Sequence, residues 1–291
     1  MDILTNYTFQ IVALGSVILA VAAAPVGAFS VYKGQSLIGD AIGHSTFPGI
    51  ILAYMAFATR SPIILLAGAI LAGAASYALI QLAHKDKRLG LDANLAIFLS
   101  GFFGLGMALK SFIQGNPDYA GASQAGLGTY IFGQAAYMLE ADVLLIAVVS
   151  ALVLTLLLLF YKELKLFVFD AEYAEVVGLP CRLLNLLLLV MTIAVIGIGI
   201  KAVGAILISS FLIIPCVAAN QWSNNFARVL LLSSLIGAVS ALVGTYISTL
   251  EQGMSTGPSI ILVASLIAFF SIVFGTKGIL GSVLKRRHAH G

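Results

Sequence analysis

The stretch SLIGDAIGHSTFPG, residues 36–49, carries an aspartate and a histidine four positions apart beside an otherwise apolar run. In the whole chain of 291 residues only 9% are charged and 60% are hydrophobic. A charge within a bilayer costs about 2.5 to 3.5 kcal/mol or more, so it rarely persists there without a role. We therefore interpret Asp40 and His44 as candidate functional residues in an apolar chain.

Apolar segments of about 18 or more residues recur along the chain, as in an all-α polytopic membrane protein. Polar residues divide one membrane domain, 1–291, into about nine predicted spans. These spans are 9–31, 37–58, 61–83, 91–109, 141–161, 182–200, 203–221, 228–249 and 257–276. Eight spans remain an alternative, because 37–58 and 203–221 contain proline or glycine and one of them can be short or re-entrant.

Basic residues orient these spans, because cytoplasmic loops of membrane proteins are enriched in Lys and Arg. The segments 84–88 and 161–165 and the basic tail 285–291 are therefore predicted to be cytoplasmic. With these segments on the cytoplasmic side, only three of the 15 Lys and Arg residues fall on the external side of the membrane: Arg60, Lys110 and Lys201. The pattern predicts an external N-terminus with nine spans.

Two loops are longer than a turn. The external loop 110–140 mixes glycine and small polar residues with aromatic residues, and we interpret it either as a docking surface or as a passive linker. The cytoplasmic segment 170–178 is predicted to be a helix of about two turns, capped by Asp170 and ended by Gly178. Its charged residues are acidic, which favours a protein partner over the anionic leaflet; a solvated connector is the alternative. The residues assigned to this partner contact are Asp170, Glu172, Tyr173, Glu175 and Gly178.

Residues four apart on a helix lie on the same face, with Cβ atoms roughly 6 Å apart. Asp40 and His44 can therefore share one divalent cation at about 2.0 to 2.2 Å from each ligand atom. Manganese, iron and zinc all accept nitrogen and oxygen ligands. The alternative is structural, with Asp40 near a helix start and His44 packed in an interface. Cys216 is interpreted as a buried apolar residue, with a soft metal ligand as its alternative role.

Three neighbouring residues strengthen the interpretation of the pair as metal ligands. Gly39 and Gly43 have the spacing that lets another backbone approach a membrane helix. Pro48 has no amide hydrogen for the His44 carbonyl, so a kink is expected there and the carbonyl is one more candidate oxygen ligand.

Motifs for other functions are missing from the sequence. It contains no GxxxxGK[ST] for nucleotide phosphates, no HExxH and no complete GxSxG. The chain is therefore predicted not to be an enzyme, and not to hydrolyse ATP itself. No basic block interleaves with aromatic residues, so nucleic acid is not an expected partner.

Four stretches, in this order, carry a family resemblance: SLIGDAIGHSTFPGI, FVFDAEYAEVVGLP, AVGAILISSFLIIPCVAAN and STGPSIILVASLIAFF. The chain resembles the permease subunit of bacterial manganese, zinc and iron ABC importers, the ABC-3 family. At the start of the predicted helix 170–178 it departs from relatives with FDPE, because residues 169–172 read FDAE. The loss of this proline should leave the predicted helix intact.

The resemblance implies a type II ABC importer permease fold, working as a homodimer in the bacterial cytoplasmic membrane. It implies two cytoplasmic ATPase subunits that bind ATP and grip 170–178, and an extracellular or periplasmic metal-binding protein. It also puts Asp40 and His44 in the metal pathway. Manganese is the expected cargo and zinc or iron the alternatives, with no permanently bound cofactor. A proton-coupled secondary metal transporter that uses Asp40 and His44 as a relay is the rival interpretation.

Overall fold

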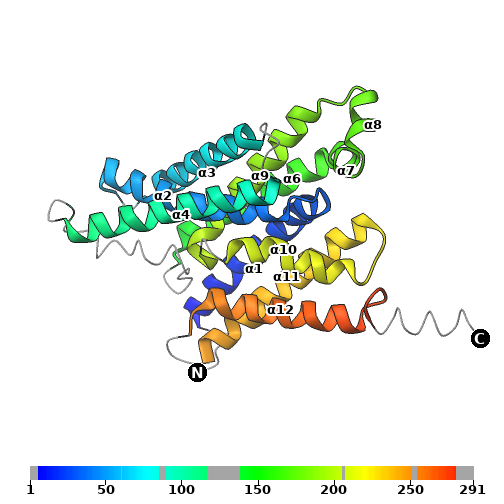
Figure 1. The fold of residues 1–291 in the computed structure, drawn as a ribbon. Coiled ribbons are helices and arrows are strands. Elements are labelled where there is room, and N and C mark those ends of the chain that lie inside the picture. Colours follow the sequence, from blue (N-terminus) through cyan, green and yellow to red (C-terminus); the bar gives the residue numbers. More distant parts are fainter. Residues whose placement is uncertain are drawn as a thin grey trace, which may run out of the picture.

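A computed structural model describes residues 6–59, 61–84, 90–116, 119, 138–204, 207–250 and 254–279, and every regular element in these ranges is a helix (Figure 1). One helix coincides with each predicted span. These helices are α1 (Tyr7–Tyr32), α2 (Ser36–Phe57), α3 (Pro62–His84), α4 (Leu91–Gly115), α6 (Glu140–Leu159), α9 (Cys181–Val203), α10 (Ile208–Asn220), α11 (Phe226–Leu250) and α12 (Thr256–Phe274).

Seven of these helices are long and apolar enough to cross a membrane; α2 and α10 are not among them. Helix α10 has 13 residues, which corresponds to about 20 Å, well short of the hydrocarbon core of about 30 Å. Helix α2 is long enough, but its first half carries the polar residues around Asp40 and His44. The predicted all-helical membrane architecture is confirmed in the described residues, whereas the count of nine spans is not.

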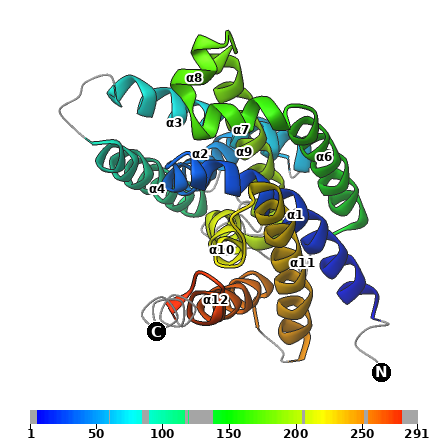
Figure 2. The same ribbon diagram turned by 90° about the vertical axis from the view of Figure 1, so that its right-hand side faces the viewer.

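Helix α1 is the central helix, in contact with α6, α9, α10 and α11 (Figure 2). Small residues in its second half, Ala20, Ala22, Ala23 and Ala24, are completely buried. A methyl group at Gly27 would lie 2.0 Å from the carbonyl oxygen of Leu212 in α10. Small side chains let helix backbones meet in a membrane protein, and this contact fixes α10 against α1.

Helix α2 packs between α3 and α4 (Figure 1). Its closest approach to α3 is at Gly49, where a methyl group would lie 2.2 Å from the carbonyl oxygen of Gly68. On the α4 side, Gly106 faces Phe47 and Pro48. The helix is continuous through Pro48 and ends at Phe57, and the capping residue Ala58 has a left-handed backbone.

The predicted helix at 170–178 is present as α8 (Ala171–Val176), which has six residues and is shorter than two turns. The Asp170 carboxylate accepts a hydrogen bond from the Tyr173 amide at 2.9 Å, and Gly178 has a φ of +87°. Both end signals are therefore confirmed. A second helix, α7 (Tyr161–Phe169), precedes α8 and was not predicted. Its Leu164 and Phe167 are buried, so it packs on the bundle.

The predicted external loop 110–140 overlaps the ends of α4 and α6, and most of the rest lies outside the described residues. The basic tail 285–291 also lies outside them. The roles predicted for these two segments stay predictions.

Candidate cation site on helix α2

The turn between α1 and α2 sets the position of the Asp40 and His44 pair. Gly34 has a φ of +73°, a left-handed conformation that favours glycine, and α2 starts two residues later at Ser36. Asp40 lies in the second turn of α2 and His44 one turn further along. The side chain of Asp40 is 31% exposed and that of His44 is 12% exposed. The pair is therefore shielded on most sides by the described protein.

The two side chains point to the same place. His44 Nε2 lies 3.5 Å from Asp40 Oδ1. Two ligand atoms at this separation, each about 2.1 Å from one ion, subtend an angle of about 110° at the ion, close to tetrahedral. The pair can therefore hold a divalent cation between its two ligand atoms with little movement.

The structure adds Ser209 of α10 to this pair. Ser209 Oγ donates a hydrogen bond to Asp40 Oδ1 at 2.8 Å. Ser209 was not predicted from the sequence, although its stretch carries part of the family resemblance. The only local signal is a pair of serines at the start of an apolar helix. Ser209 therefore holds the Asp40 carboxylate in place beside the cation position.

The imidazole ring of His44 is held by packing. It meets the ring of Phe103 in α4 edge to face, with centroids 4.9 Å apart. Its Nδ1 atom is buried and has no hydrogen-bond partner among the described residues. The nitrogen directed at Asp40 is therefore Nε2, the atom that a cation would meet.

The other predicted residues of α2 lie close by. Gly39 and Gly43 are buried, and a methyl group at Gly39 would meet a side-chain carbon of Leu212 in α10 at 3.2 Å. Pro48 is buried near Gly106 of α4. Cys216 is buried in α10. No three His, Cys, Asp or Glu side chains gather among the described residues, so Cys216 does not join the pair.

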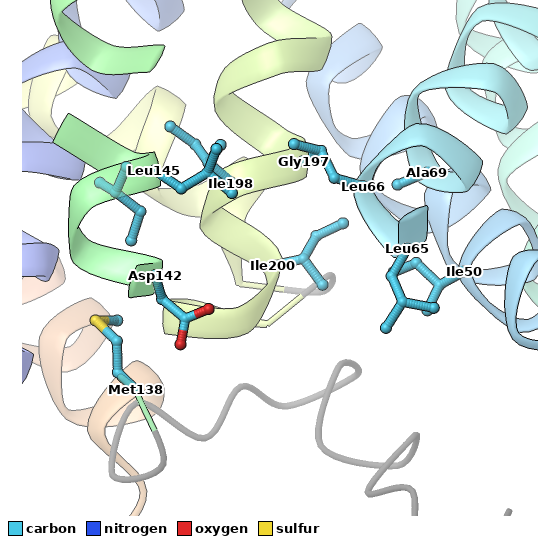
Figure 3. Close-up of a pocket in the computed structure, with 11 residues that line it drawn as sticks. Ile50, Leu65, Leu66, Ala69, Met138, Asp142, Leu145, Gly197, Ile198 and Ile200 are labelled. Carbon is cyan, nitrogen blue, oxygen red and sulfur yellow. The ribbon is translucent and has the colours of Figure 1, made fainter. Parts of the chain in front are cut away.

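A separate cavity lies between α2, α3, α6 and α9, and its lining is largely apolar (Figure 3). The carboxylate of Asp142 and the thioether of Met138 lie at one side of it. Asp142 accepts a hydrogen bond from the Leu139 amide at 2.8 Å and thereby caps α6. Neither Asp40 nor His44 lines this cavity. The structural role of Asp142 as a cap accounts for its burial.

Lys33 lies just after α1. Its Nζ atom donates a hydrogen bond to Asn185 of α9 and lies 4.6 Å from the centroid of the Phe167 ring in α7. Burial lowers the pKa of Lys33 to about 8, because the ammonium loses hydration there. This residue ties the α1–α2 turn to the helix that precedes α8.

The chain is similar to known membrane transport proteins over nearly its whole length. The family model described as ABC 3 transport family matches residues 5–275. The zinc transport system membrane protein TroC of Treponema pallidum is 38% identical over 288 residues, covering 99% of this chain and 96% of TroC. The manganese transport system membrane protein MntC of Bacillus subtilis is 38% identical over 268 residues, which cover 92% of this chain and 61% of MntC.

A solved structure has the same fold. PsaBC from Streptococcus pneumoniae in complex with Fab matches with a TM-score of 0.83 at 27% identity, covering 94% of each chain. The seven apolar helices and these relatives confirm the expected localisation, a multi-pass protein of the bacterial cytoplasmic membrane. Because the family model covers nearly the whole chain, this protein belongs to the ABC 3 transport family, as an ABC transporter permease.

Proposed function

We propose that this chain is the permease of an ATP-driven importer for a divalent transition metal ion, with manganese as the favoured cargo and zinc or iron as alternatives. The observation that carries the proposal is the convergence of Asp40 Oδ1, His44 Nε2 and Ser209 Oγ in a sheltered part of an apolar bundle. The carboxylate oxygen of Asp40 and the imidazole nitrogen of His44 suit all three metals, and Ser209 holds the carboxylate. The names of the relatives, which include zinc and manganese transport systems, support the same cargo class.

The proposed importer is a homodimer. In each copy Asp40 remains partly exposed, and α4 beside it leaves Gly101 and Gly104 without a neighbour within 4 Å. Glycines on a helix face let a second helix approach closely in a membrane. Two copies that meet near this face would offer two Asp and two His ligands, and the two carboxylates would neutralise a dication. The cavity between the copies would open alternately outward, toward a binding protein, and inward.

The energy for transport would come from separate cytoplasmic ATPase subunits that contact α8. Three apolar or aromatic side chains of this segment are exposed: Tyr173, Val176 and Val177. They stand beside the carboxylates of Glu172 and Glu175, so the surface suits a protein groove better than an anionic lipid surface. This contact favours the ABC importer over a proton-coupled carrier, because a secondary carrier has no ATPase to engage.

Replacing Val176 by aspartate is expected to reduce co-purification of the ATPase about tenfold or more. Val176 is 84% exposed, so the change should leave the fold intact while it puts a charge into the apolar contact. Ile279→Asp is a matched control, because Ile279 is also exposed and follows α12, a helix that lies away from α8 in the bundle (Figure 2). Equal loss of ATPase in both variants would contradict an α8-specific contact.

Uptake into vesicles tests the transport mechanism itself. The permease is reconstituted with its ATPase, and uptake of radiolabelled manganese, zinc and iron is measured with ATP or with a non-hydrolysable analogue. Uptake that requires ATP hydrolysis and survives a protonophore supports the importer. Uptake that needs no ATP and stops with the protonophore would support the proton-coupled carrier instead. The label taken up at the lowest concentration identifies the metal.

A further inference from the structure

Five aromatic rings connect α7, the first part of the coupling segment α7–α8, with the core, and we name them the aromatic cluster. The ring of Phe226, the first residue of α11, lies between 4.9 and 6.3 Å from the four others. The cluster consists of Phe29, Tyr32, Tyr161, Phe169 and Phe226. Tyr161 and Phe169 are the first and last residues of α7, so α7 is attached to the end of α1 at both of its own ends.

Tyr32 extends this attachment beyond the rings. Its hydroxyl donates a hydrogen bond of 2.8 Å to the side-chain oxygen of Asn220, the last residue of α10. Lys277, which follows α12, donates to the same oxygen at 3.2 Å. One end of α10 is therefore tied to the last residue of α1, directly beside the aromatic cluster.

The other end of α10 reaches the candidate cation site. Ser209 is the second residue of α10, and its hydroxyl holds the Asp40 carboxylate at 2.8 Å. Between its ends, α10 meets the backbone of α1 at Gly27 with no side chain between them. Helix α10 runs without a break through Pro215 and has 13 residues, so it is about 20 Å long. Pro215 removes one backbone hydrogen bond from the helix, but the direct backbone contact with α1 at Gly27 supports it. A shift at Asn220 should therefore reach Ser209 rather than be absorbed along the way.

We propose that α10 is a rod that carries movement of the coupling segment α7–α8 to Asp40, with Tyr32 and Ser209 as positioning residues at its two ends. The inference rests on the proposed importer function, in which an ATPase moves α8. Neither Tyr32 nor Asn220 needs to touch the cation. Their part is to make the position of the Asp40 carboxylate depend on the position of α7.

The test is the number of cations taken up per ATP hydrolysed by the reconstituted complex, measured with radiolabelled manganese. Tyr32→Phe keeps the ring in the cluster and removes only the bond to Asn220. It is expected to leave ATPase assembly and ATP hydrolysis near wild type and to lower uptake per ATP about fivefold. Tyr246→Phe is the matched control, because Tyr246 meets the ring of Phe9 edge to face outside the aromatic cluster. The control should retain the wild-type ratio.

A double variant tests whether Tyr32 and Ser209 act together through α10 or independently of each other. Ser209→Ala also lowers uptake, because Asp40 is no longer held. If both residues act through α10, adding Tyr32→Phe to Ser209→Ala causes little further loss. The proposed role of α10 would be wrong if the losses of uptake in the two single variants multiplied in the double variant. It would also be wrong if Tyr32→Phe kept the wild-type uptake per ATP. A wild-type complex that hydrolyses ATP without any metal uptake would instead reject the proposed function, so the two failures are distinct.

Discussion

Uptake of radiolabelled manganese or zinc is expected to fall about 100-fold or more when Asp40 is replaced by alanine, and equally when His44 is replaced. Each change removes one of the two ligand atoms that lie 3.5 Å apart. Loss of a residue that merely orients a metal ligand costs about 10- to 100-fold, so loss of a ligand itself should cost at least as much. Uptake is measured in cells, with membrane levels and ATPase assembly determined alongside.

The matched control for this experiment is Asp92→Ala. Asp92 is an exposed carboxylate in the first turn of α4 and lies outside the candidate cation site. Wild-type uptake in this variant would show that loss of a carboxylate as such does not stop transport. Normal uptake in assembled Asp40→Ala and His44→Ala complexes would mean that the pair is structural. The cation path would then have to be sought elsewhere in the chain.

Local sequence was enough to predict the Asp40 and His44 pair, because their spacing of four residues brings them together on any helix. Ser209 could not be found in this way. It is 169 positions from Asp40, and only the packing of α10 against α2 brings the two together. The same limit applies to Tyr32 and Asn220, whose hydrogen bond joins residues 188 positions apart. A contact between residues so far apart produces no repeating pattern in the sequence of either helix, so local sequence cannot predict it.

The errors about helices also have physical reasons. The span 203–221 was predicted from its apolar residues, but Gly204, with a φ of +98°, separates α9 from α10 and leaves a helix of 13 residues. Helix α7 was missed because its charged residues Lys162, Glu163 and Lys165 were used only to orient the chain. The ends of α8 were predicted correctly, since Asp170 and Gly178 are strong local signals.

Gly27→Ala is expected to destabilise the protein by about 3 kcal/mol or more, at the upper end of the effect of overpacking. The added methyl group would lie 2.0 Å from the carbonyl oxygen of Leu212, and a backbone atom cannot move aside as a flexible side chain can. Thermal unfolding of the purified complex in detergent measures this loss. Gly237→Ala is the matched control, because its methyl group would meet Ala20 at an ordinary 3.4 Å.

The control should unfold at or slightly above the wild-type temperature, because alanine is the better helix former. Equal stability of the two variants would contradict the close contact between α1 and α10. Where Gly27→Ala still folds, α10 must move away from α1, and Ser209 must move with it. Metal uptake should then fall more than the amount of folded protein, since the carboxylate of Asp40 depends on the position of α10.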